Sequence, residues 1–383
     1  MHKDTNVLQE NTLSDKICLL PWIHIEADPN GAARPCCMWQ GKPVGNFNTQ
    51  TIEDVWQGPE MQQLRAEFLA GEQPKGCANC WSAERAGYNS KRLNDAQRFK
   101  HHSNRPYETL AKPVYLDLKL GNICNIKCRI CSSDYSFKWR EDERKIYGQA
   151  RNTQDIIWVS EDADFWTNLS RNLSDLEFID LTGGEPFLVK PMWQLLEQCV
   201  QQGVAQNISL HYNTNGTILP TPEQRELWRH FKWVETMFSI DGTDAKFEYQ
   251  RDPAQWQTVV HNLNTIRTEG VTHTSICYTV NTFNVLDIPE FDTWSRSTVN
   301  IKPYWNLLHG PAHYSIKHIP ERAKQVIADK ISNYADIVKY MTSTTADAHT
   351  WQQFLWHTQQ LDSVRKQSFS TVFPELHRII TNE

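Results

Sequence analysis

Between residues 113 and 310 of this 383-residue chain, six strand-like segments alternate with helical ones. Strands that alternate with helices are typical of parallel βα units. Successive side chains of a strand point to opposite faces, so each segment separates into one apolar and one polar face. The six segments read VYLDLKL, EFIDLT, ISLHYNTNG, VETMFSIDG, TSICYTVNT and IKPYWNLL.

The polar faces restrict the architecture further. A closed barrel normally fills its lumen with branched apolar side chains, and a polar lumen costs desolvation unless something polar occupies it. We therefore predict an α/β fold, a partial (β/α)6 TIM-like barrel whose interior is a ligand cavity. The alternative is an antiparallel sheet with one solvated face. Candidates for proton transfer or hydrogen donation inside the lumen are Asp117, Lys119, Asp180, His211, Glu235 and Tyr304.

Composition divides the chain into four parts. Residues 1–90 hold five of the ten cysteines and include a helical stretch that ends at Gly71. Residues 91–112 are polar and predict a linker helix. The barrel follows at 113–310, and residues 311–383 read as a helical extension. We expect the first part to form a small domain of a β-hairpin and helices, joined by the linker to the barrel.

The N-terminus lacks the apolar core of a signal peptide, and no apolar run approaches the ~18 residues of a membrane span. We therefore expect a cytoplasmic protein that is not bound to a membrane. Thiols stay reduced in the cytoplasm, so metal explains ten cysteines better than disulfides do. A net charge of −6 argues against a nucleic-acid partner. Cys199 and Cys277 stand apart from the clustered cysteines, and we expect both to be small core residues.

Three cysteines lie close together in GNICNIKCRIC, directly after the first strand. Cys124, Cys128 and Cys131 can hold three irons of a cubane cluster and leave the fourth without a protein ligand. A zinc site would need a fourth Cys or His at close spacing, and residues 132–145 contain neither. From the triplet alone, an iron–sulfur cluster, zinc and unliganded thiols all remain open.

The surroundings of the triplet resemble the radical S-adenosylmethionine (SAM) superfamily. The resemblance rests on the triplet after the first strand, LTGGEP at the end of the second, NTNGT and SIDG. It implies a 4Fe–4S cluster whose open iron chelates SAM. It also implies methionine contacts from the Gly-Gly-Glu-Pro turn, whose glycines would let the backbone approach the ligand. The implied cofactor-binding residues are Gly183, Gly184, Glu185, Pro186, Asn215, Ser239 and Asp241, with Ile130 near the adenine, where the family usually has an aromatic residue.

The first cysteine group is similar to the twitch or SPASM auxiliary-cluster modules of that superfamily, although here it precedes the barrel. CLLPWIHIEADPNGAARPCC predicts two strands joined by a turn, with CANC further along. The resemblance implies one auxiliary 4Fe–4S cluster. Its predicted ligands are Cys18, Cys36, Cys77 and Cys80, with Cys37 as an alternative to Cys36. A zinc ribbon on the same cysteines is the other possibility.

The resemblance implies an oxidoreductase-like radical enzyme that cleaves SAM reductively to a 5′-deoxyadenosyl radical, with an external one-electron reductant such as flavodoxin or ferredoxin. Our leading expectation for the substrate is a peptide or protein side chain. The alternatives are radical oxidation, dehydration or rearrangement of a small polar metabolite such as a sugar or nucleotide, and an electron carrier or scaffold without radical chemistry. Arg365 is a candidate for binding an acidic substrate.

Overall fold

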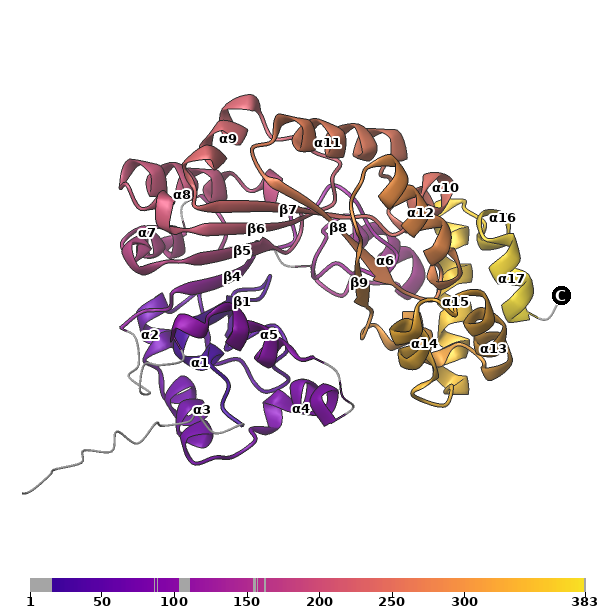
Figure 1. Cartoon of the computed structure of the whole chain (residues 1–383), viewed down its shortest axis with the longest axis horizontal. Coiled ribbons are helices and arrows are strands. Elements are labelled where there is room, and N and C mark those ends of the chain that lie inside the picture. The colour runs from indigo at the N-terminus through magenta and orange to yellow at the C-terminus, as the bar shows by residue number, and fades with distance from the viewer. Residues whose placement is uncertain are drawn as a thin grey trace, which may run out of the picture.

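The computed structural model describes residues 16–381 except 86, 88, 103–110, 154, 155, 157 and 162 (Figure 1). The predicted first domain and the predicted linker therefore lie partly outside the described residues. Within them, one sheet of nine strands forms the centre of the molecule, in the order β3-β2-β1-β4-β5-β6-β7-β8-β9.

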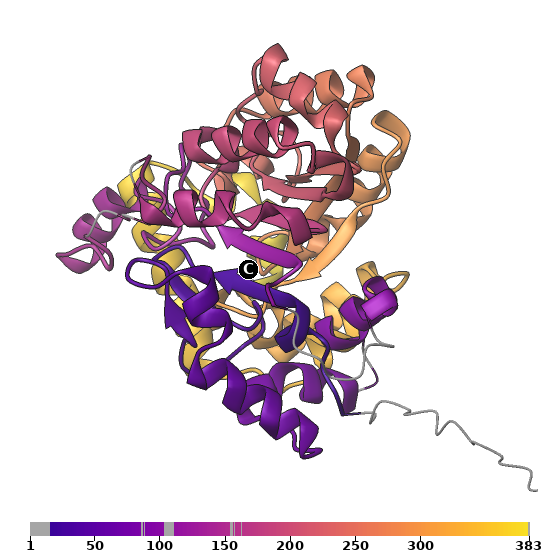
Figure 2. The same cartoon turned by 90° about the vertical axis from the view of Figure 1, so that its left-hand side faces the viewer.

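The six strands predicted from the sequence are all present and all parallel to their neighbours in this series. The sheet begins at β3 and ends at β9 without closing, which confirms the predicted partial barrel. Figure 2 shows its curvature, with the indigo N-terminal strands beside β4 and the orange β9 at the other edge. The six predicted strands are β4 (Tyr115–Lys119), β5 (Phe178–Thr182), β6 (Ser209–Thr214), β7 (Trp233–Ser239), β8 (His273–Val280) and β9 (Tyr304–Leu307).

Helices cover the apolar face of the sheet, as the alternation predicted. Leu116, Leu181 and Leu210 are each 0–1% exposed against them. Burying one such side chain contributes about 1.5–3 kcal/mol, so this apolar layer is a main source of stability. The covering and connecting helices are α6 (Trp139–Tyr147), α7 (Asp164–Ser170), α8 (Lys190–Gln201), α9 (Pro222–Leu227), α10 (Asp244–Gln250), α11 (Trp256–Glu269) and α12 (Ile288–Thr298).

The N-terminal part contributes strands to the same sheet, which the sequence did not lead us to expect. β1 (His24–Ala27) runs parallel to β4, with Ile25 opposite Leu116. The expected hairpin pairs β1 with β2 (Ala32–Arg34), and the turn is closed by Gly31 N donating to Asp28 O at 2.8 Å. The remaining elements are α1 (Leu20–Ile23), β3 (Gly45–Asn46), α2 (Ile52–Trp56), α3 (Pro59–Leu69), α4 (Ala78–Arg85) and α5 (Lys91–Arg98).

The stretch predicted as one helix up to Gly71 is two helices. The backbone leaves the helical region at Gly58, whose ψ is 156°, and α3 starts at Pro59. Proline disfavours a helical conformation in the residue before it and is favoured at the first position of a helix.

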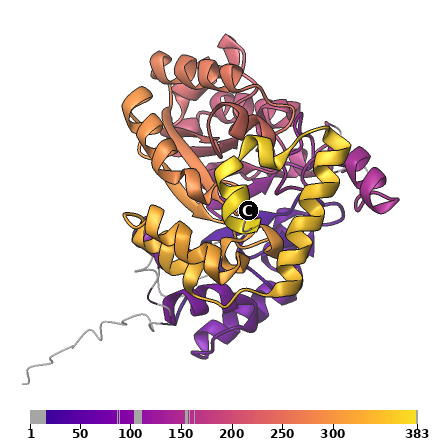
Figure 3. The ribbon, with the colours of Figure 1, turned by 90° about the vertical axis from the view of Figure 1, so that its right-hand side faces the viewer.

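The C-terminal part is helical, as predicted, and Figure 3 shows these helices, orange to yellow, in front of the sheet. Arg129, between two of the clustered cysteines, donates to Asp362 at 2.5 Å and to Gln367 at 2.8 Å. The extension thus packs against the cysteine loop. Its helices are α13 (Glu321–Lys330), α14 (Ala335–Thr342), α15 (Ala348–Arg365), α16 (Phe369–Val372) and α17 (Pro374–Thr381). No helix among the described residues combines the length and the apolar character needed to cross a bilayer.

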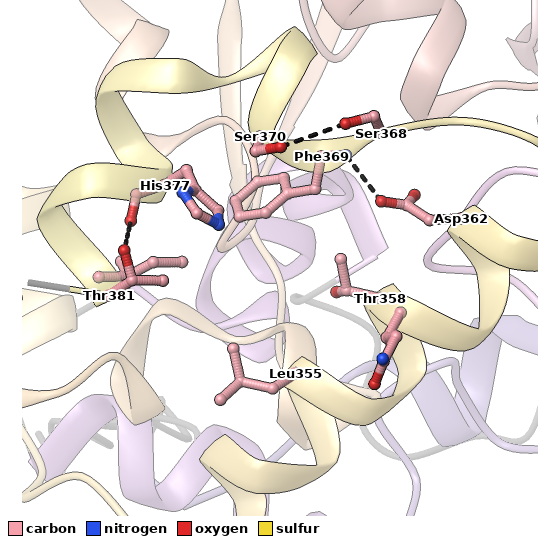
Figure 4. Close-up of a pocket in the computed structure, with 10 residues that line it drawn as sticks. Leu355, Thr358, Asp362, Ser368, Phe369, Ser370, His377 and Thr381 are labelled. Carbon is pink, nitrogen blue, oxygen red and sulfur yellow. Dashed lines mark hydrogen bonds between the residues drawn. The ribbon is translucent and has the colours of Figure 1, made fainter. Parts of the chain in front are cut away.

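A pocket of about 240 Å³ lies among α15, α16 and α17 (Figure 4). Its Asp362 is already committed to Arg129, to the hydroxyl of Tyr249 at 2.8 Å and to Phe369 N at 2.7 Å. No cysteine lines this pocket. The cysteines that suggested a metal site from the sequence lie elsewhere, in the loop that carries Arg129.

Candidate active site

The three clustered cysteines converge on one pocket. The loop after β4 carries Cys124, Cys128 and Cys131, which all line a cavity of about 190 Å³. Backbone hydrogen bonds fix the loop against the segment after α10, where Lys127 N donates to Asp252 O at 2.7 Å. Trp139 Nε1 donates to Cys128 O at 2.9 Å. A loop held from two sides presents its thiols in one direction.

The Gly-Gly-Glu-Pro turn is packed directly against this loop. Gly184 N donates to Gly121 O at 3.0 Å, and Glu185 N donates to Ile123 O at 2.8 Å. A Cβ on Gly184 would lie 2.3 Å from Ile123 O, and one on Gly183 would lie 2.5 Å from Leu120 N. Both glycines line the cavity. The missing side chains also let the turn pack against backbone atoms of the cysteine loop, so the two glycines set the position of that loop.

Glu185 turns into the protein and is not among the residues that line the cavity. Its carboxylate accepts from Asn215 N at 2.8 Å, from Thr214 Oγ1 at 2.9 Å and from Phe187 N at 3.3 Å. Burial raises the pKa of Glu185 to about 7, although these hydrogen bonds oppose the shift. Glu185 therefore joins the end of β5 to the end of β6. Pro186 starts the short 3-10 helix Pro186–Leu188 and also lies outside the cavity lining.

Strand-end residues form the far wall of the cavity. Asn215 and Ser239 line it, and the Asn215 amide lies 3.7 Å from Cys124 Sγ. Asp241 does not line it, and Arg251 Nε and Nη2 lie 2.9 and 2.7 Å from its carboxylate. Ile130 is half-buried and packs against the hydrophobic core outside the cavity lining.

Among the cavity residues that sequence reasoning missed, two have side chains that can carry charge or a proton, Arg251 and Tyr135. Arg251 lines the cavity and donates to Cys128 Sγ at 3.6 Å. Its position, just after α10, belongs to no motif, and only the ion pair with Asp241 aims it. Tyr135 also lines the cavity, four residues after Cys131. Burial raises the pKa of Tyr135. The charge of Lys119 opposes this shift, and the charges of Asp28, Glu26 and Cys131 add to it.

The cavity fits a cluster with three protein ligands. Burial raises the pKa of the Cys124 thiol to about 12 and also raises the pKa of Cys128 and Cys131. Thiols in this state are poor nucleophiles but become thiolates when they bind metal. No fourth Cys or His lines the cavity. The donor set therefore leaves one coordination position of a 4Fe–4S cluster to a non-protein ligand.

The four predicted auxiliary ligands also share one pocket. Cys18, Cys36, Cys77 and Cys80 line a small hollow of about 20 Å³ together with Trp81 and Arg92. Cys37 is absent from this lining and is exposed. Burial of the Cys37 thiol raises its pKa to about 12, and the charge of Lys91 opposes this shift. Cys36 thus lines the hollow while Cys37 lies outside it, in a turn closed by Trp39 N donating to Cys36 O at 3.1 Å.

The predicted lumen residues lie on the polar face of the sheet. Lys119 Nζ forms ion pairs with Glu26 and, at 3.1 Å, with Asp28. His211 Nδ1 lies 2.8 Å from Glu235. Burial opposes protonation of His211, but the hydrogen bond to Glu235 and the charge of Asp180 raise its pKa. Tyr304 is exposed, with its pKa raised by partial burial and by Cys277 and Cys37.

Three residues outside these sets have a defined place. Cys199 is fully buried in the apolar core, as expected. Cys277 is buried on the strand face that carries Thr279, and its Sγ lies 4.0 Å from Thr279 Oγ1. Arg365, considered as a ligand for an acidic substrate, is buried against Asp142 at 2.8 Å and stacks over Trp139. The charge of Arg365 is therefore paired with Asp142 in the protein interior.

A partial parallel barrel with three cysteines after its first predicted strand, and four more in an adjoining module, has the donor sets for two iron–sulfur clusters. Residues 118–294 match the model of the Radical SAM superfamily, and residues 18–81 match the SPASM model, described as an iron–sulfur cluster-binding domain. No curated protein matches the chain. The chain therefore contains a region that matches the radical SAM model, preceded by a SPASM-like N-terminal module. The two matched models imply 4Fe–4S clusters and SAM as cofactors.

Several solved structures resemble the chain. Native anSMEcpe with bound AdoMet and Cp18Cys peptide is 14% identical with a TM-score of 0.40, over 61% of this chain and 62% of that one. SuiB of Streptococcus suis bound to S-adenosylmethionine is 13% identical with a TM-score of 0.37, over 90% and 75%. TYW1 with a lysine-pyruvate adduct is 13% identical with a TM-score of 0.34, over 59% and 73%. The chain thus spans about three fifths of the first of these proteins, and likeness at this level carries no conclusion about substrate.

Proposed function

We propose that this enzyme generates a 5′-deoxyadenosyl radical and uses it to abstract hydrogen from a peptide or protein side chain. The observation that carries the proposal is the single cavity shared by Cys124, Cys128 and Cys131, with Gly183, Gly184, Asn215 and Ser239 around it. When bound, the cluster and SAM together supply a one-electron cleavage of the sulfonium and the radical that results.

The chain's own residues then have distinct tasks. Cys124, Cys128 and Cys131 hold the cluster and leave one iron open to SAM. Asn215 and Ser239 offer polar groups to the bound SAM, while Glu185 fixes the turn and the strand ends from behind. Asp241 acts through Arg251, which it aims at Cys128. The C-terminal helices back the cysteine loop through Arg129, which helps to keep water from the site.

In the auxiliary module, Cys18, Cys36, Cys77 and Cys80 hold the second cluster, with Cys37 outside the ligand set. This proposal rests on their shared hollow. Residues 1–90 then form the auxiliary module, 91–112 the connection, 113–310 the radical SAM barrel and 311–383 the helical support. The enzyme takes its electron from an external reductant such as flavodoxin or ferredoxin, and it works in the cytoplasm, where its thiols stay reduced.

Modification of a small polar metabolite is the second candidate, favoured by the polar lumen around Lys119 and His211. Asp117, Lys119, His211 and Tyr304 remain candidates there for a catalytic acid, base or donor.

The test incubates anaerobically reconstituted protein with SAM and dithionite and measures 5′-deoxyadenosine. The wild type should form it, and Cys128→Ala should form none, because a cluster with two thiolate ligands is not retained. Cys199→Ala, a buried cysteine remote from both pockets, is the matched control and should keep the activity. Absence of 5′-deoxyadenosine from the wild type would reject the proposal. Adding peptides or sugar nucleotides to the same assay distinguishes the two substrate classes.

A further inference from the structure

A row of ionisable side chains crosses the polar face of the sheet. The strand register places Glu26 of β1 opposite Asp117 of β4, and Asp117 opposite Asp180 of β5. The row then continues through His211 of β6 and Glu235 of β7. Five successive parallel strands thus each contribute one titratable group at the same level. In a barrel without a polar ligand, apolar side chains would occupy such a level.

This row faces the same side as the SAM cavity and lies just below it. Thr182 and Asn213 line the cavity, and Asp180 and His211 precede them by two residues on the same strands. Residues two apart point to the same face and are separated by about 6.6 Å along the strand. The row is therefore one side-chain layer beneath the place where the radical forms, where a substrate has to enter.

Two acceptors in the row have no partner among the described residues. Asp117 is 5% exposed and its Oδ1 is buried without a hydrogen bond. Glu26 is fully buried, and while its Oε1 accepts from Lys119, its Oε2 has no partner. Buried carboxylate oxygens normally accept a hydrogen bond. Two facing ones without a partner therefore indicate a donor that the described residues do not supply.

The charges around the row are unbalanced. Lys119 is paired with Glu26 and Asp28, and His211 is paired with Glu235. Within the described part of the chain, neither Asp117 nor Asp180 lies within ion-pair distance of a Lys, Arg or His, and Asp180 accepts only from the Tyr115 hydroxyl. Lys91, the next cation, is paired with Asp95 at 2.9 Å. Burial and the neighbouring carboxylates raise the pKa of Asp117, and burial raises that of Glu26. A cationic hydrogen-bond donor placed between them would both satisfy the free oxygens and favour the ionised carboxylates.

We propose that Asp117, together with Glu26, binds a positively charged nitrogen of the substrate, a protonated amine or a guanidinium. This inference rests on the proposed radical function of the same site and narrows its substrate class. An anionic substrate, such as a nucleotide, would meet repulsion from Asp117, Asp180 and Glu26. The carbon that reacts lies in the layer between this nitrogen and the SAM cavity. The N-terminal module is part of the substrate site, because Glu26 comes from β1.

The experiment titrates three small probes into the reconstituted holoenzyme with SAM and without reductant: n-butylammonium, 1-butanol and butyrate. The wild type should bind n-butylammonium at least tenfold more tightly than 1-butanol and should bind butyrate least. Asp117→Asn should abolish the preference for the cation. Asp175→Asn, an exposed aspartate outside the row and before β5, is the matched control and should keep the preference. Isothermal titration measures each affinity.

Equal affinities of the wild type for the three probes, no binding of the cation, or an unchanged preference in a folded Asp117→Asn would each overturn the proposal. If Asp117→Asn does not fold, Glu26→Gln is used and should weaken the preference severalfold. Formation of 5′-deoxyadenosine is measured in the same wild-type preparation. Its absence would reject the radical function while the probe affinities still decide whether the cation site exists, so the two failures are distinguishable.

Discussion

At the scale of single residues, Gly184 gives the sharpest prediction. Its missing Cβ leaves room for Ile123 O, a backbone atom of the cysteine loop that cannot rotate away. Gly184→Ala should displace the loop, destabilise the protein by about 1–3 kcal/mol and lower its retained iron. Gly310→Ala is the control, because no atom lies within 4 Å of its Cβ position. Thermal unfolding and iron analysis after gel filtration measure the effects, and normal iron content in Gly184→Ala would contradict this role.

Glu185 leads to a prediction about pH. Burial raises its pKa from 4.5 to about 7, so the folded protein keeps a proton that the unfolded chain releases above pH 4.5. The free energy of unfolding should therefore fall as pH rises from about 4.5 to 7, with this one residue contributing about 3 kcal/mol. Glu185→Gln should flatten this part of the profile. Urea unfolding of both proteins at pH 5 and pH 8 measures the difference, and parallel profiles would show that Glu185 does not titrate in this range.

At the scale of elements, the contact between α15 and the cysteine loop depends on one ion pair. Arg129 has no exposed side-chain surface, and Asp362 is its acidic partner. Asp362→Asn leaves the guanidinium buried without a countercharge, which should cost about 3–5 kcal/mol and release the SAM-binding cluster before the auxiliary one. Asp329→Asn on exposed α13 surface is the control. Anaerobic thermal unfolding followed by the visible absorption of the clusters tests this, and simultaneous loss of both clusters would argue against a local role of α15.

At the scale of the whole molecule, the two cysteine pockets predict the iron content. The reconstituted wild type should contain about eight iron atoms per chain, four in each cluster. Replacing Cys124, Cys128 and Cys131 by alanine should leave about four, and so should replacing Cys18, Cys36, Cys77 and Cys80. Cys37→Ala should keep about eight. A loss of four in Cys37→Ala, measured by iron and sulfide analysis, would move Cys37 into the ligand set in place of Cys36.

The amino-acid sequence by itself determined the six parallel strands, the polar face of the barrel and the class of cofactor, because strand periodicity and cysteine spacing are local. It also pointed to Gly183, Gly184, Asn215 and Ser239, which stand at strand ends where local pattern predicts position. Arg251 at Cys128, Tyr135 in the cavity and the inward turn of Glu185 were decided only by the tertiary structure. So were the pairing of β1 with β4 and the row from Glu26 to Glu235. Each of these depends on strand register and on ion pairs between segments far apart in the chain, and no local pattern encodes which distant partner a strand or a charge will meet.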